Sequence, residues 1–307
     1  LSSKWAFLAY LFAFFGMIGG LPAVQSNQMV QIITEFAMPI LSFDNQLVFD
    51  IVCGLIIAVL AGTVIIGGLT RIAKASSWLV PIMGGLYVLT ATFILIANYE
   101  DVPNVIKTIF SDAFTGTSVA GGTLMGVIMY GIQRGAFSNE AGIGTEALIH
   151  GTAKTNSPIK QGFVAMIGPI FDTLLICTAT AVVIILSGLW MGDQYSGVSL
   201  TAMAFQTFLG SIGVVVVFLC VVFFGISTIF TYSYYGSVCA RFLFGPKGQK
   251  IYLYVFIATI IFFASISLDS AINIIDGSFA MMAIPTLISS IILAPKVIAE
   301  ANKFLAR

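Results

Sequence analysis

The chain has 307 residues, of which 59% are hydrophobic and only 8% are charged, and its mean hydropathy is +1.04. Soluble globular domains carry about 25% charged residues, so this composition nearly excludes a soluble enzyme or a secreted disulfide scaffold. The 13 basic residues balance the 13 acidic residues, which leaves no basic face for a nucleic acid. The composition therefore predicts an all-α polytopic protein in a lipid bilayer.

Apolar runs of nearly the length of a membrane helix, roughly 20 residues, recur along the whole chain. We therefore expect a single transmembrane domain that covers residues 1–307. We expect eight spans, at 5–24, 47–69, 78–97, 119–137, 162–189, 211–236, 251–267 and 270–294. Seven of them are uniformly apolar. The run at 119–137 instead passes into polar and glycine-rich sequence that continues to residue 150.

The charges predict the orientation of these spans. With eight crossings, one side receives eleven of the thirteen basic residues: Lys4, Arg71, Lys74, Lys154, Lys160, Arg241, Lys247, Lys250, Lys296, Lys303 and Arg307. The opposite side holds Glu35, Asp44, Asp50, Glu100, Asp101, Asp112, Asp193 and Asp269, with Lys107 as its cation. Basic residues in short loops mark the cytoplasm, so we expect a multi-pass plasma-membrane protein with both termini cytoplasmic.

The amides at the end of the first span, Gln25, Asn27 and Gln28, admit two interpretations. They are either a polar cap at the external interface or side chains that contact a substrate, and the sequence does not separate the two. Residues 98–118 are too long for a tight turn. Val102, Val105 and Ile109 recur there at helical spacing, which predicts an external interfacial helix that acts either as a surface cover or as a lid.

The segment 119–150 carries the strongest local signal. Its glycines and polar residues lie inside a would-be membrane helix: Gly131, Arg134, Gly135, Asn139, Glu140, Gly142 and Gly144. A GxxxG packing face explains the glycines but not the polar run 138–140. A helix interrupted inside a membrane is tolerated where it lines a cavity, and transporters bind ions and substrates at such breaks. We therefore predict a discontinuous helix, unwound around 135–142.

A row of hydroxyls follows helical spacing in the sixth span, at Thr228, Thr231, Tyr232 and Tyr235. A cation site is one interpretation of this row, but taken alone it is better explained by hydrogen bonding between helices and an aromatic belt. Asp172 and Asp276 are further acids within spans, and His150 is the single histidine. The chain contains no HExxH, GxSxG or Walker sequence, so an enzyme is not expected.

The run RGAFSNEAGIG at 134–144 resembles the signature of the bacterial and archaeal sodium:alanine/glycine symporter family. The similarity continues in order through 153–155, 161–162, 171–173, 177–180, 233–236 and 282–285, and so covers essentially the whole chain. The resemblance implies a five-plus-five inverted-repeat bundle of the leucine-transporter type. On that plan the eight spans are core helices three to ten, 119–150 is the discontinuous sixth helix, and the chain is incomplete at its N-terminus.

The resemblance also implies secondary active symport of a small neutral amino acid, alanine or glycine, with Na⁺ as coupling ion and no other cofactor, by alternating access. The implied substrate-binding residues are Gln25, Tyr130, Gly131, Gly135, Asn139 and Tyr232, and the implied Na⁺ ligands are Ser227 and Thr228. Tyr130 replaces a tryptophan common in the family, which alters the shape of the pocket. Three alternatives remain. They are a larger amino-acid substrate, a channel, and a proton-coupled transporter that uses Glu140, Glu146, Asp172 or Asp276.

Overall fold

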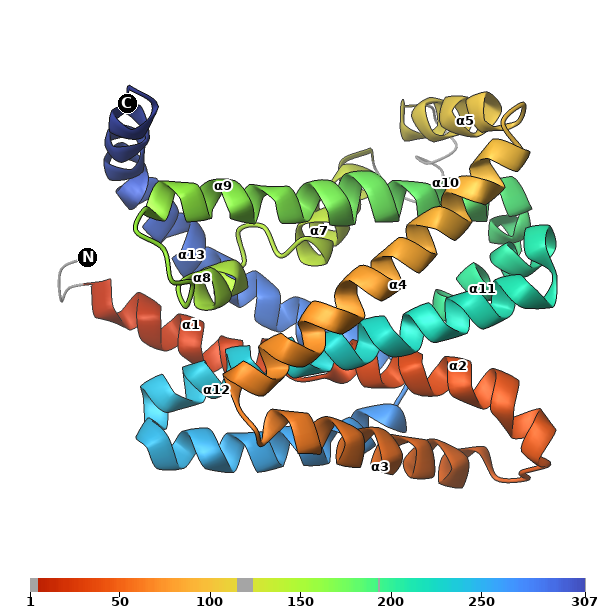
Figure 1. Cartoon of the computed structure of the whole chain (residues 1–307), viewed down its shortest axis with the longest axis horizontal. Coiled ribbons are helices and arrows are strands. Elements are labelled where there is room, and N and C mark those ends of the chain that lie inside the picture. Colours follow the sequence, from red (N-terminus) through yellow and green to blue (C-terminus); the bar gives the residue numbers. More distant parts are fainter. Residues whose placement is uncertain (1–4, 115–123, 193, 307) are drawn as a thin grey trace.

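The computed structural model describes residues 5–114, 124–192 and 194–306, and every regular element in these residues is helical (Figure 1). The elements are α1 (Ala6–Gly19), α2 (Ala23–Leu41), α3 (Gln46–Ile65), α4 (Leu69–Ala97), α5 (Val102–Phe114), α7 (Leu124–Ser138), α8 (Thr145–His150), α9 (Pro158–Pro169), the π-helix η2 (Ile170–Cys177), α10 (Thr178–Ser187), the 3₁₀-helix η3 (Leu189–Met191), α11 (Gly197–Leu209), α12 (Ser211–Ala264) and α13 (Leu268–Leu305).

Six helical segments of the described residues are long and apolar enough to cross a membrane. They are Ala6–Leu41, Gln46–Ile65, Leu69–Ala97, Pro158–Ser187, Ser211–Ala264 and Leu268–Leu305. Much of their apolar surface faces outward, and only 11% of the most apolar window of Pro158–Ser187 is buried. Water would not tolerate so continuous an apolar exterior, whereas lipid tails cover it without cost. This is the architecture of a polytopic membrane protein.

Helix α12 is a hairpin rather than one rod. Its helical path is broken at Gly245, whose φ of 69° lies in the left-handed region, and Pro246 follows directly. Two arms of α12 run antiparallel on either side of this turn (Figure 1). The predicted spans 211–236 and 251–267 are these two arms. The total of eight spans stays a prediction, because part of 119–137 lies outside the described residues.

The first predicted span, 5–24, is wrong at its C-terminal end. The chain bends at 20–22 and continues as α2 to Leu41, so the amides stand in the middle of a 36-residue segment. Two of the amides bond to backbone far away in the sequence, and the choice between an interfacial cap and a substrate contact stays a prediction. Asn27 Nδ2 donates to the Ile266 carbonyl at 2.6 Å, and Gln28 Oε1 accepts from the Val198 N–H at 2.9 Å.

The bend between α1 and α2 is packed tightly against α12. A Cβ on Gly20 would lie 3.1 Å from the backbone nitrogen of Gly236, so these two backbones touch. The bend also frees carbonyls at the end of α1, and the Tyr252 hydroxyl donates to the Met17 carbonyl at 2.8 Å. Tyr252 is buried, with 7% of its surface exposed.

We expect Tyr252→Phe to destabilise the protein by about 1–3 kcal/mol, the cost of leaving a buried carbonyl without a donor. Thermal unfolding of the detergent-purified protein measures the effect. Tyr254→Phe is the matched control, because Tyr254 is 65% exposed on the same arm of α12. Equal unfolding temperatures for the two variants would contradict this account of the bend.

Helix α12 lies at the centre of the packing and contacts α1, α2, α3, α4, α8 and α11. One core cluster joins it to α2, α3 and α13 and includes Ile229 and Phe256. A second cluster joins it to α4, α10 and α11 and includes Tyr87 and Phe205. Ile143, between α7 and α8, is 1% exposed and belongs to the first cluster, so the central packing holds this segment in place.

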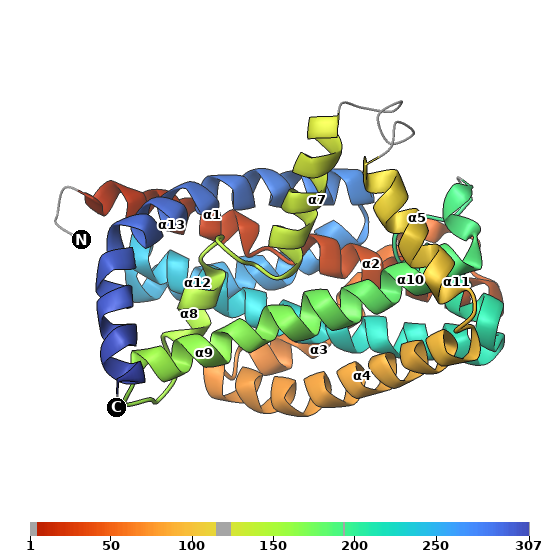
Figure 2. The same cartoon turned by 90° about the horizontal axis from the view of Figure 1, so that it is seen from above.

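The two ends of the bundle differ in what they carry. The start of α1, the end of α13, the turn of α12 and the α8–α9 connection share one end, while α5 lies at the other (Figures 1 and 2). Consecutive long helices run in alternating directions (Figure 1), so every second connection between them lies at the same end of the bundle. The cytoplasmic orientation of the termini and the external position of 98–118 stay predictions. Lys4, Asp193, Arg307 and residues 115–118 lie outside the described residues.

Candidate functional site

The chain is non-helical between α7 and α8, from residue 139 to residue 144. Glu140, Gly142 and Gly144 adopt positive φ angles of 56°, 81° and 100°. We refer to residues 139–144 as the interruption. Unwinding was expected from Gly135 onward, and this is wrong, because α7 remains helical through Ser138. A glycine in a helix lowers stability only modestly and does not by itself unwind it.

The π-helix η2 forms one wall of the interruption. Ser138 Oγ donates to Asp172 Oδ2 at 2.8 Å, and Asn139 Nδ2 donates to Thr173 Oγ1 at 3.2 Å. The side-chain oxygen Oδ1 of Asn139 also accepts from the Ala141 N–H at 3.0 Å, and this bond spans the point where the chain leaves α7. Short π-helical turns are rare and occur frequently at functional sites.

Helix α12 forms the opposite wall. The Glu140 carboxylate accepts a short hydrogen bond from Thr145 Oγ1 and also interacts with the hydroxyls of Tyr232 and Tyr235. Tyr232 in turn interacts with the Gln25 side chain of α2. The interruption, α8, α12 and α2 therefore converge on one carboxylate.

Helices α13 and α1 close the third side. Thr286 Oγ1 donates to the Ile143 carbonyl at 2.9 Å. A Cβ on Gly144 would lie 2.5 Å from Thr286 Oγ1 and 2.7 Å from the Phe12 ring. Glycine is therefore required at 144 both for its backbone angle and for its close contacts.

An ion pair ties α7 to α13 beyond the interruption. The Arg134 guanidinium bonds Asp276 through two nitrogens, at 3.2 and 2.7 Å, and Gln133 Nε2 donates to the same carboxylate at 3.2 Å. The guanidinium also lies 4.9 Å from the centre of the Tyr130 ring. Such two-pronged pairs are stronger and more directional than single contacts.

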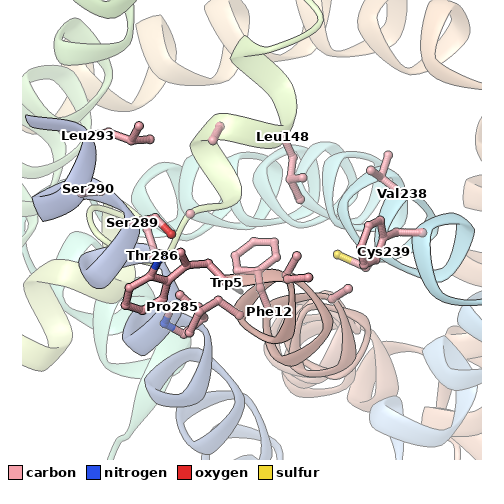
Figure 3. A pocket seen from close by; sticks show the side chains of 17 residues that line it. Trp5, Phe12, Leu148, Val238, Cys239, Pro285, Thr286, Ser289, Ser290 and Leu293 are labelled. Carbon is pink, nitrogen blue, oxygen red and sulfur yellow. The ribbon is translucent and has the colours of Figure 1, made fainter. Parts of the chain in front are cut away.

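A cavity of about 690 Å³ lies beside the interruption, between α1, α8, α12 and α13 (Figure 3). Its wall is mainly apolar, with Trp5, Phe12 and Leu148 among the residues that line it, and Thr286 and Ser289 add hydroxyls. The cavity reaches the interruption at Gly144. The predicted substrate-binding residues do not belong to its described lining.

Three of the six predicted substrate-binding residues meet at the interruption. Asn139 is its first residue, Tyr232 faces Glu140, and Gln25 faces Tyr232. Tyr130 is 61% exposed on α7. A Cβ on Gly131 or on Gly135 would meet no atom within 4 Å, so neither glycine is in close contact here.

The two predicted Na⁺ ligands lie on α12, one helical turn before Tyr232. Ser227 is 4% exposed, and its hydroxyl donates to the Phe224 carbonyl at 3.0 Å. Thr228 is partly exposed. The roles of these two residues, like those of the six substrate-binding residues, stay predictions.

The sequence did not single out Thr145, Thr173 or Thr286 as site residues. Two features of the sequence could have identified them. The first is the resemblance to the symporter family, because Thr173 belongs to one resembling segment and Thr286 directly follows another. Thr145 opens α8 directly after the glycine-rich run, at a position where a hydroxyl reaches back into the interruption. Pairing such residues with Glu140 requires the fold, because the partners Tyr232 and Tyr235 come from a distant helix.

Comparison with known proteins agrees with this architecture. The family model described as the sodium:alanine symporter family matches residues 1–307. An uncharacterized transporter of Haemophilus influenzae is 35% identical over 317 residues, 100% of this chain and 67% of that protein. The uncharacterized transporter YflA of Bacillus subtilis is 38% identical over 260 residues, 83% of this chain and 55% of that protein.

The sodium/alanine symporter AgcS of Methanococcus maripaludis is 35% identical over 305 residues, 97% of this chain and 65% of that protein. The chain thus spans between about half and two thirds of the length of these relatives. The full-length match of the family model and the all-helical, lipid-facing bundle lead to one conclusion: the chain belongs to the sodium:alanine symporter family.

Proposed function

We propose that the protein is a secondary active symporter that couples Na⁺ entry to uptake of a small neutral amino acid, alanine or glycine. The family consists of transporters rather than enzymes. The observation that carries the proposal is the interruption at 139–144, which gathers polar groups from α2, η2 and α12 inside an apolar bundle. Exposed backbone and polar side chains at this depth are tolerated where they line a binding site.

The substrate chemistry suits this set of groups. Alanine and glycine are zwitterions, so a buried site must offer hydrogen-bond donors to the carboxylate and acceptors to the ammonium. The amides of Gln25 and Asn139 supply both kinds of group, and the Tyr232 hydroxyl supplies either. The substrate would lie against the interruption between α2 and α12, with Tyr130, Gly131 and Gly135 of α7 approaching it as the transporter closes.

For the coupling ion we propose the hydroxyls of Ser227 and Thr228 as ligands. A hydroxyl that donates its proton, as Ser227 does to Phe224, keeps lone pairs for a cation. Two hydroxyls fit a hard cation as part of a larger set of oxygens, and the remaining ligands would come from other helices. The same proposal includes the leucine-transporter-type repeat, alternating access, a plasma-membrane location and cytoplasmic termini. The name of the relative AgcS, a sodium/alanine symporter, supports the choice of sodium and alanine.

Uptake of radiolabelled alanine into proteoliposomes tests this function. With the protein expressed from its complete gene, we expect saturable accumulation when Na⁺ is outside, competition by unlabelled glycine, and loss of accumulation when choline replaces Na⁺. If alanine accumulation is unchanged in choline and responds to a pH gradient with the acid side outside, the transporter is coupled to protons. Alanine flux that does not saturate and never exceeds equilibrium would mean a channel.

Thr228→Ala tests the ion site separately. Removal of one cation ligand should raise the Na⁺ concentration for half-maximal uptake by about tenfold, equivalent to about 1.4 kcal/mol. Thr207→Ala is the control, because the Thr207 hydroxyl bonds only the Met203 carbonyl of its own helix and is exposed. An unchanged Na⁺ dependence in Thr228→Ala would remove Thr228 from the ion site.

A further inference from the structure

The Glu140 side chain is partly buried, and hydroxyl groups surround its carboxylate. Thr145 Oγ1 donates to it, and the phenolic hydroxyls of Tyr232 and Tyr235 interact with it. The other charged group that acts on it is the Glu146 carboxylate of α8, which is of like sign. The ion pairs within the described ranges join other residues, so Glu140 has no cationic partner there.

The Asp276 carboxylate is surrounded by hydrogen-bond donors. It faces the Arg134 guanidinium, which has donors only, and the Gln133 amide nitrogen, which also donates. These partners match a group that only accepts hydrogen bonds.

Glu140 differs from Asp276 in its partners, which are hydroxyl groups. A hydroxyl both donates and accepts, so the three hydroxyls around Glu140 can donate to a carboxylate or accept from a carboxylic acid. Both protonation states find partners in the same geometry. An ionised carboxylate without a cation is costly inside an apolar bundle, and proton uptake removes that cost.

A second carboxylate lies toward α8. The Tyr235 hydroxyl interacts with Glu140, and the charge of Glu146 also acts on it. The Glu146 side chain is 36% exposed, and His150 Nε2 lies 3.4 Å from its carboxylate. The charged groups near Glu140 on this side are therefore a partly exposed carboxylate and the imidazole beside it.

We propose that Glu140 binds and releases one proton in each transport cycle, an inference that rests on the proposed transport function. A proton from water adds to a Glu140 carboxylate oxygen and gives the neutral acid. On release that O–H bond breaks and the proton returns to water. One of the surrounding hydroxyls accepts a hydrogen bond from the protonated acid while the others still donate to it, and no other covalent bond forms or breaks.

Infrared difference spectroscopy of the purified protein tests the site directly. On acidification, wild type should gain the carbonyl-stretch band of a protonated carboxylic acid, and addition of Na⁺ with alanine should change its intensity. Glu140→Gln should remove this band, Glu140→Asp should keep a shifted band, and Tyr235→Phe should shift it because one hydroxyl partner is lost. A band unchanged in both Glu140→Gln and Tyr235→Phe would overturn the proposal.

Uptake measurements separate this inference from the transport function. We expect Na⁺-driven alanine accumulation by Glu140→Gln, normalised to its own rate at a reference pH, to become independent of pH. Glu100→Gln, in the exposed turn before α5, should behave as wild type. Wild-type-like pH dependence in Glu140→Gln would overturn the proton site but leave symport intact. Absence of Na⁺-driven uptake in wild type, with the band still titrating, would overturn the proposed function alone.

Discussion

Replacement of Gly144 by alanine should disrupt the interruption and abolish transport. The backbone at 144 has a φ of 100°, where an L-residue costs roughly 1–2 kcal/mol. The added Cβ would also meet Thr286 Oγ1 at 2.5 Å and Phe12 at 2.7 Å, and overpacking of this kind costs about 1–3 kcal/mol. Thermal unfolding in detergent and alanine uptake in proteoliposomes measure the two effects.

Two other glycines, one in the interruption and one in α7, separate the effect of backbone strain from the effect of overpacking. Gly142→Ala adds backbone strain at a φ of 81° but brings its Cβ no closer than 3.5 Å to Leu287, so its effect should be smaller. Gly135→Ala lies within α7, meets no atom within 4 Å, and should stabilise the helix by up to about 1 kcal/mol. If Gly144→Ala unfolds at the same temperature as Gly135→Ala, the described geometry of the interruption is wrong.

The second large effect is expected at the pair that joins α7 to α13. Removal of one partner of a buried ion pair costs about 3–5 kcal/mol. The side chains of Arg134 and Asp276 are 38% and 17% exposed, so solvent reduces the expected cost to roughly 1–3 kcal/mol. Asp276→Ala should therefore lower the unfolding temperature and reduce alanine uptake, and Arg134→Lys should rescue little because lysine lacks the two-pronged geometry.

Exchange of the two charges provides the test of causality. The double variant Arg134→Asp with Asp276→Arg should recover part of the stability lost in Asp276→Ala. Lys303→Ala is the control, because its ion pair with Glu300 is exposed on both sides and contributes about 0–1 kcal/mol. An Asp276→Ala variant no less stable than Lys303→Ala would show that the pair does not hold α7 against α13.

Hydropathy alone located most of the long helices, because a membrane helix must be apolar over its whole length. The polar run 138–140 likewise predicted an interruption before α8, since such residues have no place in a packed apolar helix. The exact onset was not predictable. Gly135 remains helical because one glycine lowers the stability of a helix only modestly, and the turn instead begins where Asn139 Oδ1 accepts from the Ala141 N–H.

The rest depends on partners far away in the sequence. The amides of α2 looked like the end of a helix, yet Asn27 and Gln28 bond backbone that lies 239 and 170 residues away. The hydroxyl row of α12 was visible in the sequence, but its carboxylate partner Glu140 was not, because only the fold brings them together.

The most direct test of the account is equilibrium binding of radiolabelled alanine to the purified protein, in Na⁺ and in choline, for wild type, Asn139→Ala and Asn302→Ala. Asn302 is exposed on α13 and serves as the control. We predict that wild type and Asn302→Ala bind alanine in Na⁺ but not in choline, and that Asn139→Ala loses at least about tenfold in affinity, equivalent to about 1.4 kcal/mol. Equal affinity in Asn139→Ala, or binding unaffected by choline, would contradict a sodium-coupled site at the interruption.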